Sequence, residues 1–139
     1  MGNVRFQESS VAQIKIYGLK AALAPRMKAL SDAIHASVVE ALQFPADKRF
    51  HRFITLEREE FIYPPDRTDD YTIIEISMFE GRTADTKKEL IRLLFTNINN
   101  RTGISPTDIE ITIFETPKAN WGIRGFPADE LALGYKIEV

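Results

Sequence analysis

The sequence predicts an α/β (α+β) fold in which two consecutive βαβ units form a four-stranded mixed sheet with two helices on one face. Strand-like segments flank an amphipathic helix twice, and the apolar positions of the two units coincide after a shift of about sixty residues. At 139 residues, with 44% hydrophobic and 27% charged content, the chain has the composition of one globular domain. We expect this domain to span residues 12–139, with residues 1–11 as an N-terminal extension outside the fold.

The first βαβ unit is expected over residues 12–57. Residues 12–17 alternate apolar and polar side chains, which indicates a half-buried strand. The next segment is predicted to be a helix with Pro25 in its first turn, because its apolar residues recur at helical spacing: Met27, Leu30, Ile34, Val38 and Leu42. A turn at residues 45–47 then leads into a strand over residues 50–57.

The connection between the two units, residues 58–70, is predicted to be a loop because it carries two consecutive prolines and five carboxylates. Glu57, Glu59 and Glu60 at its start have two interpretations. They form either a metal-binding cluster or a solvated run of charge, and the second interpretation is favoured because runs of charge are usually solvated.

The second βαβ unit is expected over residues 71–115. Residues 71–79 are β-branched and aromatic, as in a strand, and residues 83–102 have an amphipathic helical pattern carried by Leu90, Leu93, Leu94 and Ile98. Gly103 stands where a helix C-cap favours a residue that tolerates positive φ, and residues 109–114 alternate as a strand. A crossover of this length makes the two flanking strands parallel and the connection right-handed.

The two units align residue by residue, which suggests an internal duplication. The aligned pairs are Ile14 with Ile74, Ile16 with Ile76, Leu30 with Leu90, Ile34 with Leu94, and Val38 with Ile98. Apolar residues also occupy the strand face that the two helices leave bare, so we expect other subunits to cover that face. The C-terminal segment 116–139 contains turn formers around Trp121 and an alternating strand at residues 135–139.

Composition excludes several classes of function. The formal net charge is −2 and no basic run exceeds two residues, which argues against a nucleic-acid partner. The chain has no cysteine, and its histidines, His35 and His51, lie in different elements without ligand-like spacing. We therefore expect a cytoplasmic protein without a metal or cofactor, and without a membrane segment.

Three motifs in this order carry a resemblance to a known family. They are the strand-to-helix junction at residues 79–83 (Phe-Glu-Gly-Arg-Thr), the turn at residues 103–108 (Gly-Ile-Ser-Pro-Thr-Asp) and the Asn120-Trp121-Gly122 triplet. With the two βαβ units, the chain resembles the tautomerase superfamily, which includes 4-oxalocrotonate tautomerase and macrophage migration inhibitory factor. Within it, the chain is most similar to the malonate semialdehyde decarboxylase-like branch. The resemblance implies a homotrimer whose sheets enclose a central barrel, with cofactor-independent active sites near the subunit interfaces.

The resemblance also implies where the chemistry lies. The family uses an amino-terminal proline as its amine, and the matching position here is Ala12, whose nitrogen is an internal amide and therefore not basic. The resemblance thus implies weak or lost activity for the chain as given. Arg82 matches the arginine that binds the substrate carboxylate in the decarboxylase branch, while Glu80 stands where that branch has a second arginine.

Two further positions, Trp121 and Asp47, come from the resemblance, and each has a simpler alternative. Trp121 matches a pocket tryptophan and is equally compatible with a core or interface aromatic. Asp47 lies one residue before the position of the branch's catalytic aspartate, Lys48, and a turn or capping role for Asp47 is favoured. Arg124 is assigned to substrate binding, and Arg49 and Arg52 are other candidates for positive charge near the site.

Two functions from different classes are compatible with these residues. The first is isomerase- or decarboxylase-type chemistry on a small 2-oxo or enol acid, whose carboxylate Arg82 binds. The second is a non-catalytic trimeric scaffold or a protein that binds small anions. The true N-terminus distinguishes them, because Val11 is compatible with a non-AUG start codon whose methionine is removed to leave Ala12 first.

Overall fold

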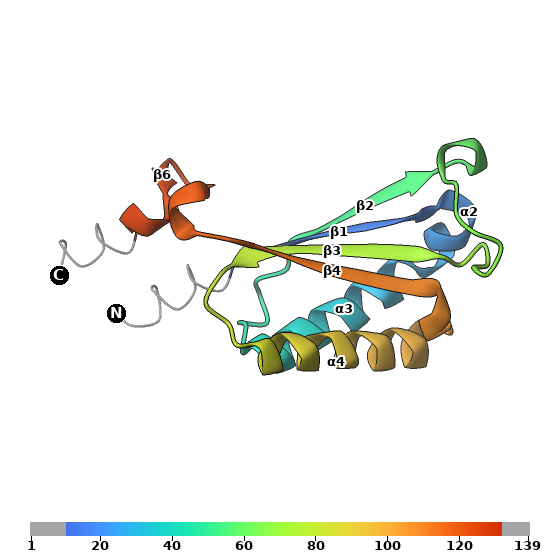
Figure 1. Ribbon diagram of the computed structural model, residues 1–139, viewed down its shortest axis with the longest axis horizontal. Helices are drawn as coiled ribbons and strands as arrows, with labels where there is room; N and C mark the ends of the chain where they lie inside the picture. The colour runs from blue at the N-terminus through green and yellow to red at the C-terminus, as the bar shows by residue number, and fades with distance from the viewer. Residues whose placement is uncertain (1–10, 132–139) are drawn as a thin grey trace.

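A computed structural model describes residues 11–131 of the chain. Its main sheet contains β1 (Ala12–Leu19), β2 (His51–Leu56), β3 (Thr72–Phe79) and β4 (Ile109–Thr116) in the order β2-β1-β3-β4. β1 pairs parallel with β2, β3 pairs parallel with β4, and the two units meet through the antiparallel pair β1 and β3. Helices α3 (Met27–Leu42) and α4 (Ala84–Thr102) lie side by side on one face of this sheet (Figure 1). The predicted mixed sheet with both helices on one face is confirmed.

The connection from β1 to α3 differs from the expectation. A short helix α2 (Lys20–Leu23) follows β1 directly, and the 3-10 turn η1 (Ala24–Arg26) contains Pro25. The prediction placed Pro25 in the first turn of the long helix, but α3 begins only at Met27. A proline removes a backbone donor and fixes φ, which suits a short turn between two helices.

The loop after β2 begins with the 3-10 turn η2 (Arg58–Glu60). Glu57 and Glu60 form a capping box, in which the Glu60 carboxylate accepts from the Glu57 backbone N–H at 2.9 Å. These exposed carboxylates therefore stabilise a turn, and the described residues contain no group of three potential metal ligands.

The core lies between the sheet and the two helices, and it repeats the predicted alignment of the units. β1 and β3 have the same pattern of buried and partly buried side chains along all eight positions. The aligned residues are buried in both units: Ile14, Ile16, Leu30, Ile34 and Val38 in the first, and Ile74, Ile76, Leu90, Leu94 and Ile98 in the second. Burying such a side chain contributes roughly 1.5–3 kcal/mol, so the two units contribute comparably to the core.

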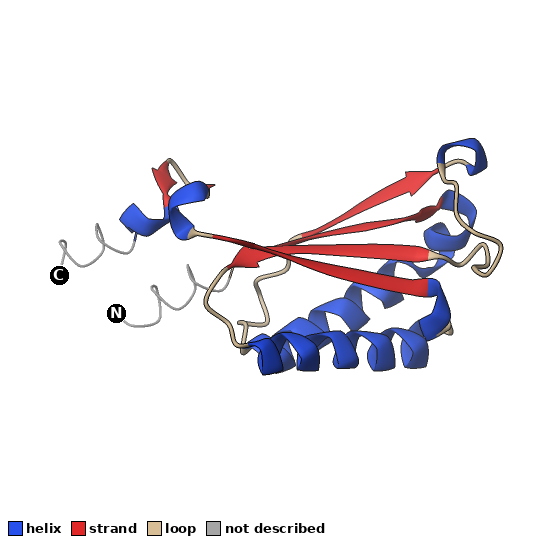
Figure 2. Ribbon diagram, viewed as in Figure 1, coloured by secondary structure: helices blue, strands red, loops and turns tan. Residues whose placement is uncertain are grey.

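The other face of the sheet is covered by no helix within the described residues (Figure 2). Tyr17 donates to Glu75 across this face at 2.7 Å, and Ile54 and Ile73 flank Tyr17 in register. Phe114 on β4 is 47% exposed. The face therefore combines apolar side chains with a few polar ones.

After β4 the chain forms the 3-10 turn η4 (Lys118–Asn120) and the two-stranded hairpin β5 (Gly122–Ile123) and β6 (Phe126–Pro127). The strand expected at residues 135–139 lies outside the described residues. Between residues 11 and 131, no helix combines the length and apolar character needed to cross a membrane.

Candidate active site

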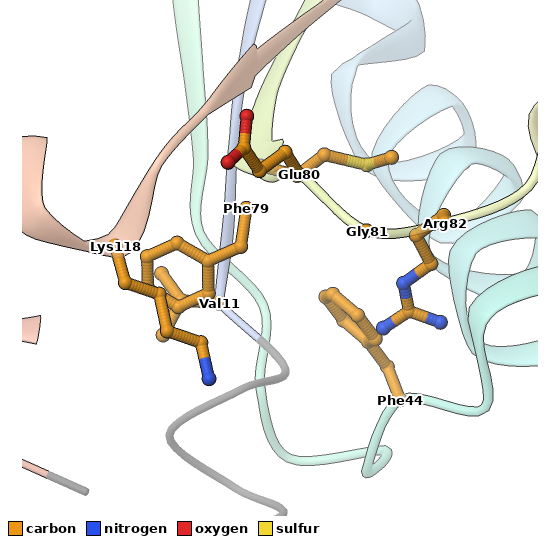
Figure 3. Close-up of a pocket in the computed structure, with 8 residues that line it drawn as sticks. Val11, Phe44, Phe79, Glu80, Gly81, Arg82 and Lys118 are labelled. Carbon is orange, nitrogen blue, oxygen red and sulfur yellow. The ribbon is translucent and has the colours of Figure 1, made fainter. Parts of the chain in front are cut away.

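A pocket of about 390 Å³ lies at the end of the sheet where β1 begins and β3 ends. Three connections build it: the residues just before β1, the loop after α3, and the junction between β3 and α4. The turn after β4 adds one further side chain. The lining residues are Val11, Phe44, Met78, Phe79, Glu80, Gly81, Arg82 and Lys118 (Figure 3).

The junction between β3 and α4 places Arg82 in the pocket wall. The Glu80 N–H donates to the Thr116 carbonyl at 3.1 Å, which ties the junction to the end of β4. Gly81 has φ +121°, a conformation that side-chain-bearing residues rarely adopt, and it lets the chain turn sharply here. Thr83 then caps α4, because its hydroxyl accepts from the Thr86 N–H at 3.1 Å.

The Arg82 guanidinium contacts the end of α3 and the loop that follows it. Its Nη1 donates to the Leu42 carbonyl at 2.8 Å, and its Cζ lies 5.6 Å from the centre of the Phe44 ring. The first contact satisfies a carbonyl that the end of α3 leaves without a helical partner, and the second is a cation–π contact. In Figure 3 the guanidinium lies beside the Phe44 ring.

The positive charge of Arg82 lacks a carboxylate partner among the described residues. Three of the described arginines are partly buried, namely Arg26, Arg67 and Arg82. Arg26 pairs with Asp70 at 2.9 Å and Arg67 with Asp66 at 2.8 Å, whereas no described ion pair involves Arg82. Burial lowers the pKa of the Arg82 guanidinium from its usual value, because the charged form loses hydration.

Lys118 supplies a second positive charge to the pocket. Its Nζ lies 5.7 Å from the centre of the Phe79 ring, and no ion pair of Lys118 is present among the described residues. The nearby carboxylate of Glu115 is paired instead with Lys87 at 2.7 Å. Glu80 also lines the pocket, but Figure 3 shows its carboxylate pointing away from both Lys118 and Arg82. The pocket interior is therefore suited to an anion.

The amino end of β1 forms another part of the wall. Val11 lines the pocket, and Ala12, which follows it, is only 3% exposed and pairs with Met78 of β3. The backbone nitrogen of Ala12 is bonded to Val11 and is thus adjacent to the pocket. Of the residues predicted from the sequence, the structure brings together Arg82 and the Val11-Ala12 position.

The remaining predicted residues do not line the pocket. Trp121 packs edge-on against Phe79 with ring centres 4.9 Å apart, behind a side chain that does line it. Asp47 is exposed in the loop after α3, where the Lys48 N–H donates to the Pro45 carbonyl at 3.1 Å. Arg124 is exposed in the hairpin between β5 and β6.

The two other candidate arginines are also engaged elsewhere. Arg49 pairs with Asp32 at 2.7 Å, and Arg52 donates to Gln13 at 3.2 Å. Sequence reasoning missed Phe44 and Lys118, which do line the pocket. The topology contained a signal for Lys118, because it follows β4, and the carboxyl ends of the parallel strands β3 and β4 lie at the same edge of the sheet.

Comparison with known proteins identifies the family. The family model for tautomerase enzymes matches residues 48–124, which is more than half of the chain. The chain belongs to the tautomerase family. The probable tautomerase YusQ of Bacillus subtilis (strain 168) is 29% identical over 100 residues, an alignment covering 68% of this chain and 79% of that protein.

Solved structures of the tautomerase superfamily have the same fold. A malonate semialdehyde decarboxylase inhibited by 3-bromopropiolate superposes with a TM-score of 0.76 at 24% identity, over 88% of this chain and 96% of that one. A fused 4-OT protein that forms an asymmetric trimer gives a TM-score of 0.77 at 21% identity, over 86% of this chain and 98% of that one. At these identities the structural likeness establishes the fold alone. The family model confirms the predicted membership of the superfamily.

Proposed function

We propose that this tautomerase-family protein acts on a small 2-oxo or enol acid by isomerase- or decarboxylase-type chemistry, with Arg82 binding the substrate carboxylate. The proposal is carried by the partly buried Arg82 guanidinium, which meets a carbonyl and an aromatic ring but no carboxylate among the described residues. A ligand carboxylate would supply the missing negative charge. The inhibition of the similar decarboxylase by 3-bromopropiolate, itself a small carboxylate, supports this ligand class.

The rest of the pocket supports the same ligand class. Phe44 and Phe79 are buried and give it apolar walls, which strengthen a charge-assisted hydrogen bond by excluding water. Lys118 adds a donor that can bind the 2-oxo or enol oxygen of the ligand. Because Glu80 replaces a second arginine, Arg82 is the principal residue that donates hydrogen bonds to the ligand carboxylate.

We propose that the free α-amine needed for family chemistry exists only in a chain whose first residue is Ala12. With Val11 attached, the nitrogen of Ala12 is an amide and cannot accept a proton. Removal of the preceding residues would create a free α-amine at the pocket wall where Val11 now lies. The nearby Arg82 and Lys118 would disfavour the protonated amine and increase the fraction available as a base.

The alternative function is a non-catalytic trimeric scaffold or a protein that binds small anions. The amide at Ala12 favours this alternative for the full chain, because the anion-binding features of the pocket do not depend on an amine. The enzyme and the anion-binding protein both require Arg82 to bind a carboxylate and differ in whether the bound ligand reacts, whereas a scaffold requires no ligand at Arg82.

We also propose that the protein assembles as a homotrimer. The exposed sheet face carries Ile54, Ile73 and Phe114, and a second copy would remove these side chains from water. The trimer formed by the similar fused 4-OT protein supports this stoichiometry. Analytical ultracentrifugation at micromolar concentration should give the trimer mass, and a stable monomer would contradict the proposal.

The anion site is tested by replacing Arg82. Arg82→Ala should weaken binding of 2-oxobutyrate by roughly ten- to a hundredfold, because a charge-assisted bidentate contact contributes about 1.5–3 kcal/mol. The matched control is Arg26→Ala, which removes an arginine of similar burial that is already paired with Asp70. Isothermal titration should give unchanged affinity for the control, and unchanged affinity for Arg82→Ala would remove the anion site.

The chemistry is tested by comparing three proteins: the full chain, a chain that begins at Ala12, and the shortened chain with Ala12→Pro. An α-amine has an unperturbed pKa of about 8, so roughly a tenth is free base at pH 7. Ketonisation of phenylenolpyruvate should be near background for the full chain, weak for the shortened chain and highest for the proline variant. Strong activity of the full chain would assign the chemistry to another residue, and an inactive proline variant would favour the scaffold.

A further inference from the structure

Phe44, in the loop after α3, lines the pocket beside Arg82, and the two residues before it shape the end of α3. Leu42 offers its carbonyl to Arg82, and Phe44 places its ring beneath the guanidinium. Gln43 between them has φ +59° and ψ +40°, the left-handed conformation. This conformation reverses the chain, so that the Leu42 carbonyl and the Phe44 ring both reach Arg82.

A left-handed glutamine is an unfavourable choice at a helix end. Residues other than glycine, asparagine and aspartate lose about 1–2 kcal/mol in this conformation, and they keep it only where surrounding contacts impose it. The Gln43 side chain itself contributes only an exposed hydrogen bond, from its Nε2 to the Glu40 carbonyl at 3.1 Å. Other contacts must therefore hold the loop after α3 in place.

One of these contacts comes from His35. Its ring is 6% exposed in the middle of α3, and its Nε2 lies 2.7 Å from the carbonyl oxygen of Ala46. A carbonyl can only accept, so this nitrogen carries the hydrogen and donates it. The bond joins α3 to the loop just beyond Phe44, across eleven residues of chain.

We propose that His35 is a positioning residue for the Arg82 anion site, acting through the Ala46 carbonyl to hold Leu42 and Phe44 against the guanidinium. This inference rests on the proposed function of Arg82. His35 does not line the pocket, so it has no direct contact with a ligand there. Its effect is to keep Arg82 preorganised, which avoids ordering the side chain and the loop when a ligand binds.

Two replacements of His35 form a matched test in the full chain. The amide of His35→Gln reaches about as far as Nε2 and can still donate to Ala46, whereas the shorter amide of His35→Asn cannot. The affinity for 2-oxobutyrate should fall about tenfold in His35→Asn, since a small misplacement of a binding group has effects of this size or larger. His35→Gln should restore affinity to within about threefold of the original protein.

The control for a merely structural effect is Ser37→Ala. Ser37 is fully buried on the same helix and accepts from Asn97 of α4 at 3.0 Å, so its loss weakens the helix pair without touching the loop. The Ser37→Ala variant should bind 2-oxobutyrate with unchanged affinity. Equal loss of affinity in Ser37→Ala and His35→Asn, or no loss in His35→Asn, would overturn the role of His35.

A second measurement works without a ligand. The Nε–H resonance of Arg82 in a ¹H–¹⁵N spectrum should broaden or exchange faster in His35→Asn than in the original protein or His35→Gln. An original protein that does not bind 2-oxobutyrate would contradict the proposed function alone. An unchanged Arg82 resonance in His35→Asn would contradict the positioning role alone.

Discussion

The two ends of the sheet are built from equivalent parts of the two βαβ units, yet one end is open and the other is filled. At the open end, the junction between β3 and α4 meets the loop after α3, and the pocket lies between them. The connection from β1 to α3 and the loop after α4, residues 103–108, both lie at the opposite end (Figure 1). The two ends differ in what covers them.

Residues 57–71 fill the opposite end. Tyr71, which aligns with Val11 after the shift of about sixty residues, is 8% exposed and stacks on Phe61 with ring centres 5.5 Å apart. The buried Asp108 accepts from the Thr68 N–H at 2.8 Å, and Arg26 pairs with Asp70 at 2.9 Å. The covering segment therefore supplies Asp70 to pair with Arg26, whereas Arg82 at the open end has no ion pair with a described residue.

The largest effects should come from the core that the two units share. Leu30→Ala and Leu90→Ala should each lower the free energy of unfolding by about 2–5 kcal/mol, because both side chains are fully buried. Urea denaturation of the two variants gives the comparison. A loss within the range of about 2–5 kcal/mol for one variant and outside it for the other would show that the two units are not equivalent in packing.

Lower pH should weaken the first unit through His51 at the start of β2. Burial, and then the neighbouring Arg49, lower the pKa of His51 to about 4 from its usual value of 6.5. Above pH 6.5 the ring is neutral in both the folded and unfolded chain. As the pH falls from 6.5 to about 4, the unfolded chain binds a proton that the folded chain resists, so stability falls; below about pH 4 this loss levels off.

Urea denaturation at pH 7.5, 6.0 and 5.0 measures this loss of stability. In His51→Gln the free energy of unfolding should change less with pH above pH 5. The carboxyl of Asp32 titrates in a lower window, because Arg49 and Lys28 lower its pKa to about 2. As the pH is lowered, amide hydrogen exchange should become faster around β2 before it becomes faster around β4. A loss of stability that persists unchanged in His51→Gln would assign the effect to other groups.

The smallest effects should come from the two left-handed helix ends. α4 ends at Gly103 with φ +79°, whereas α3 ends at Gln43 with φ +59°. Gln43→Gly should therefore raise the free energy of unfolding by about 0.5–1 kcal/mol, and Gly103→Ala should lower it by about 1 kcal/mol. Thermal denaturation of both variants measures the two changes, and changes of the same sign would contradict the comparison.

Hydrophobic periodicity was sufficient to predict the main elements. The second helix was expected at residues 83–102 and spans Ala84–Thr102, and the aligned apolar residues of both units are buried. The four-residue helix α2 was missed because so short a segment contains barely one helical turn and has no period to detect. The parallel pairing of β1 with β2 and of β3 with β4 followed from the rule for crossover connections.

The pocket was only partly predictable. Arg82 was found because it lies in a motif beside a helix start, whereas Phe44 reaches the site through a left-handed turn at Gln43 that nothing in the local sequence signals. The position of Trp121 behind Phe79 depends on how the segment after β4 folds back. Such placements are set by tertiary contacts, which periodicity does not encode.

The open end of the sheet is also where the described chain enters the fold, at Val11, and where it leaves β4, at Thr116 (Figure 1). A fluorescent label or fused tag joined close to Val11 would therefore crowd the mouth of the pocket. The covered end offers a better attachment point, since Ile62 in the segment that fills it is 91% exposed. A reporter placed beside Ile62 would leave the pocket accessible, because exposed loop tips tolerate insertions well.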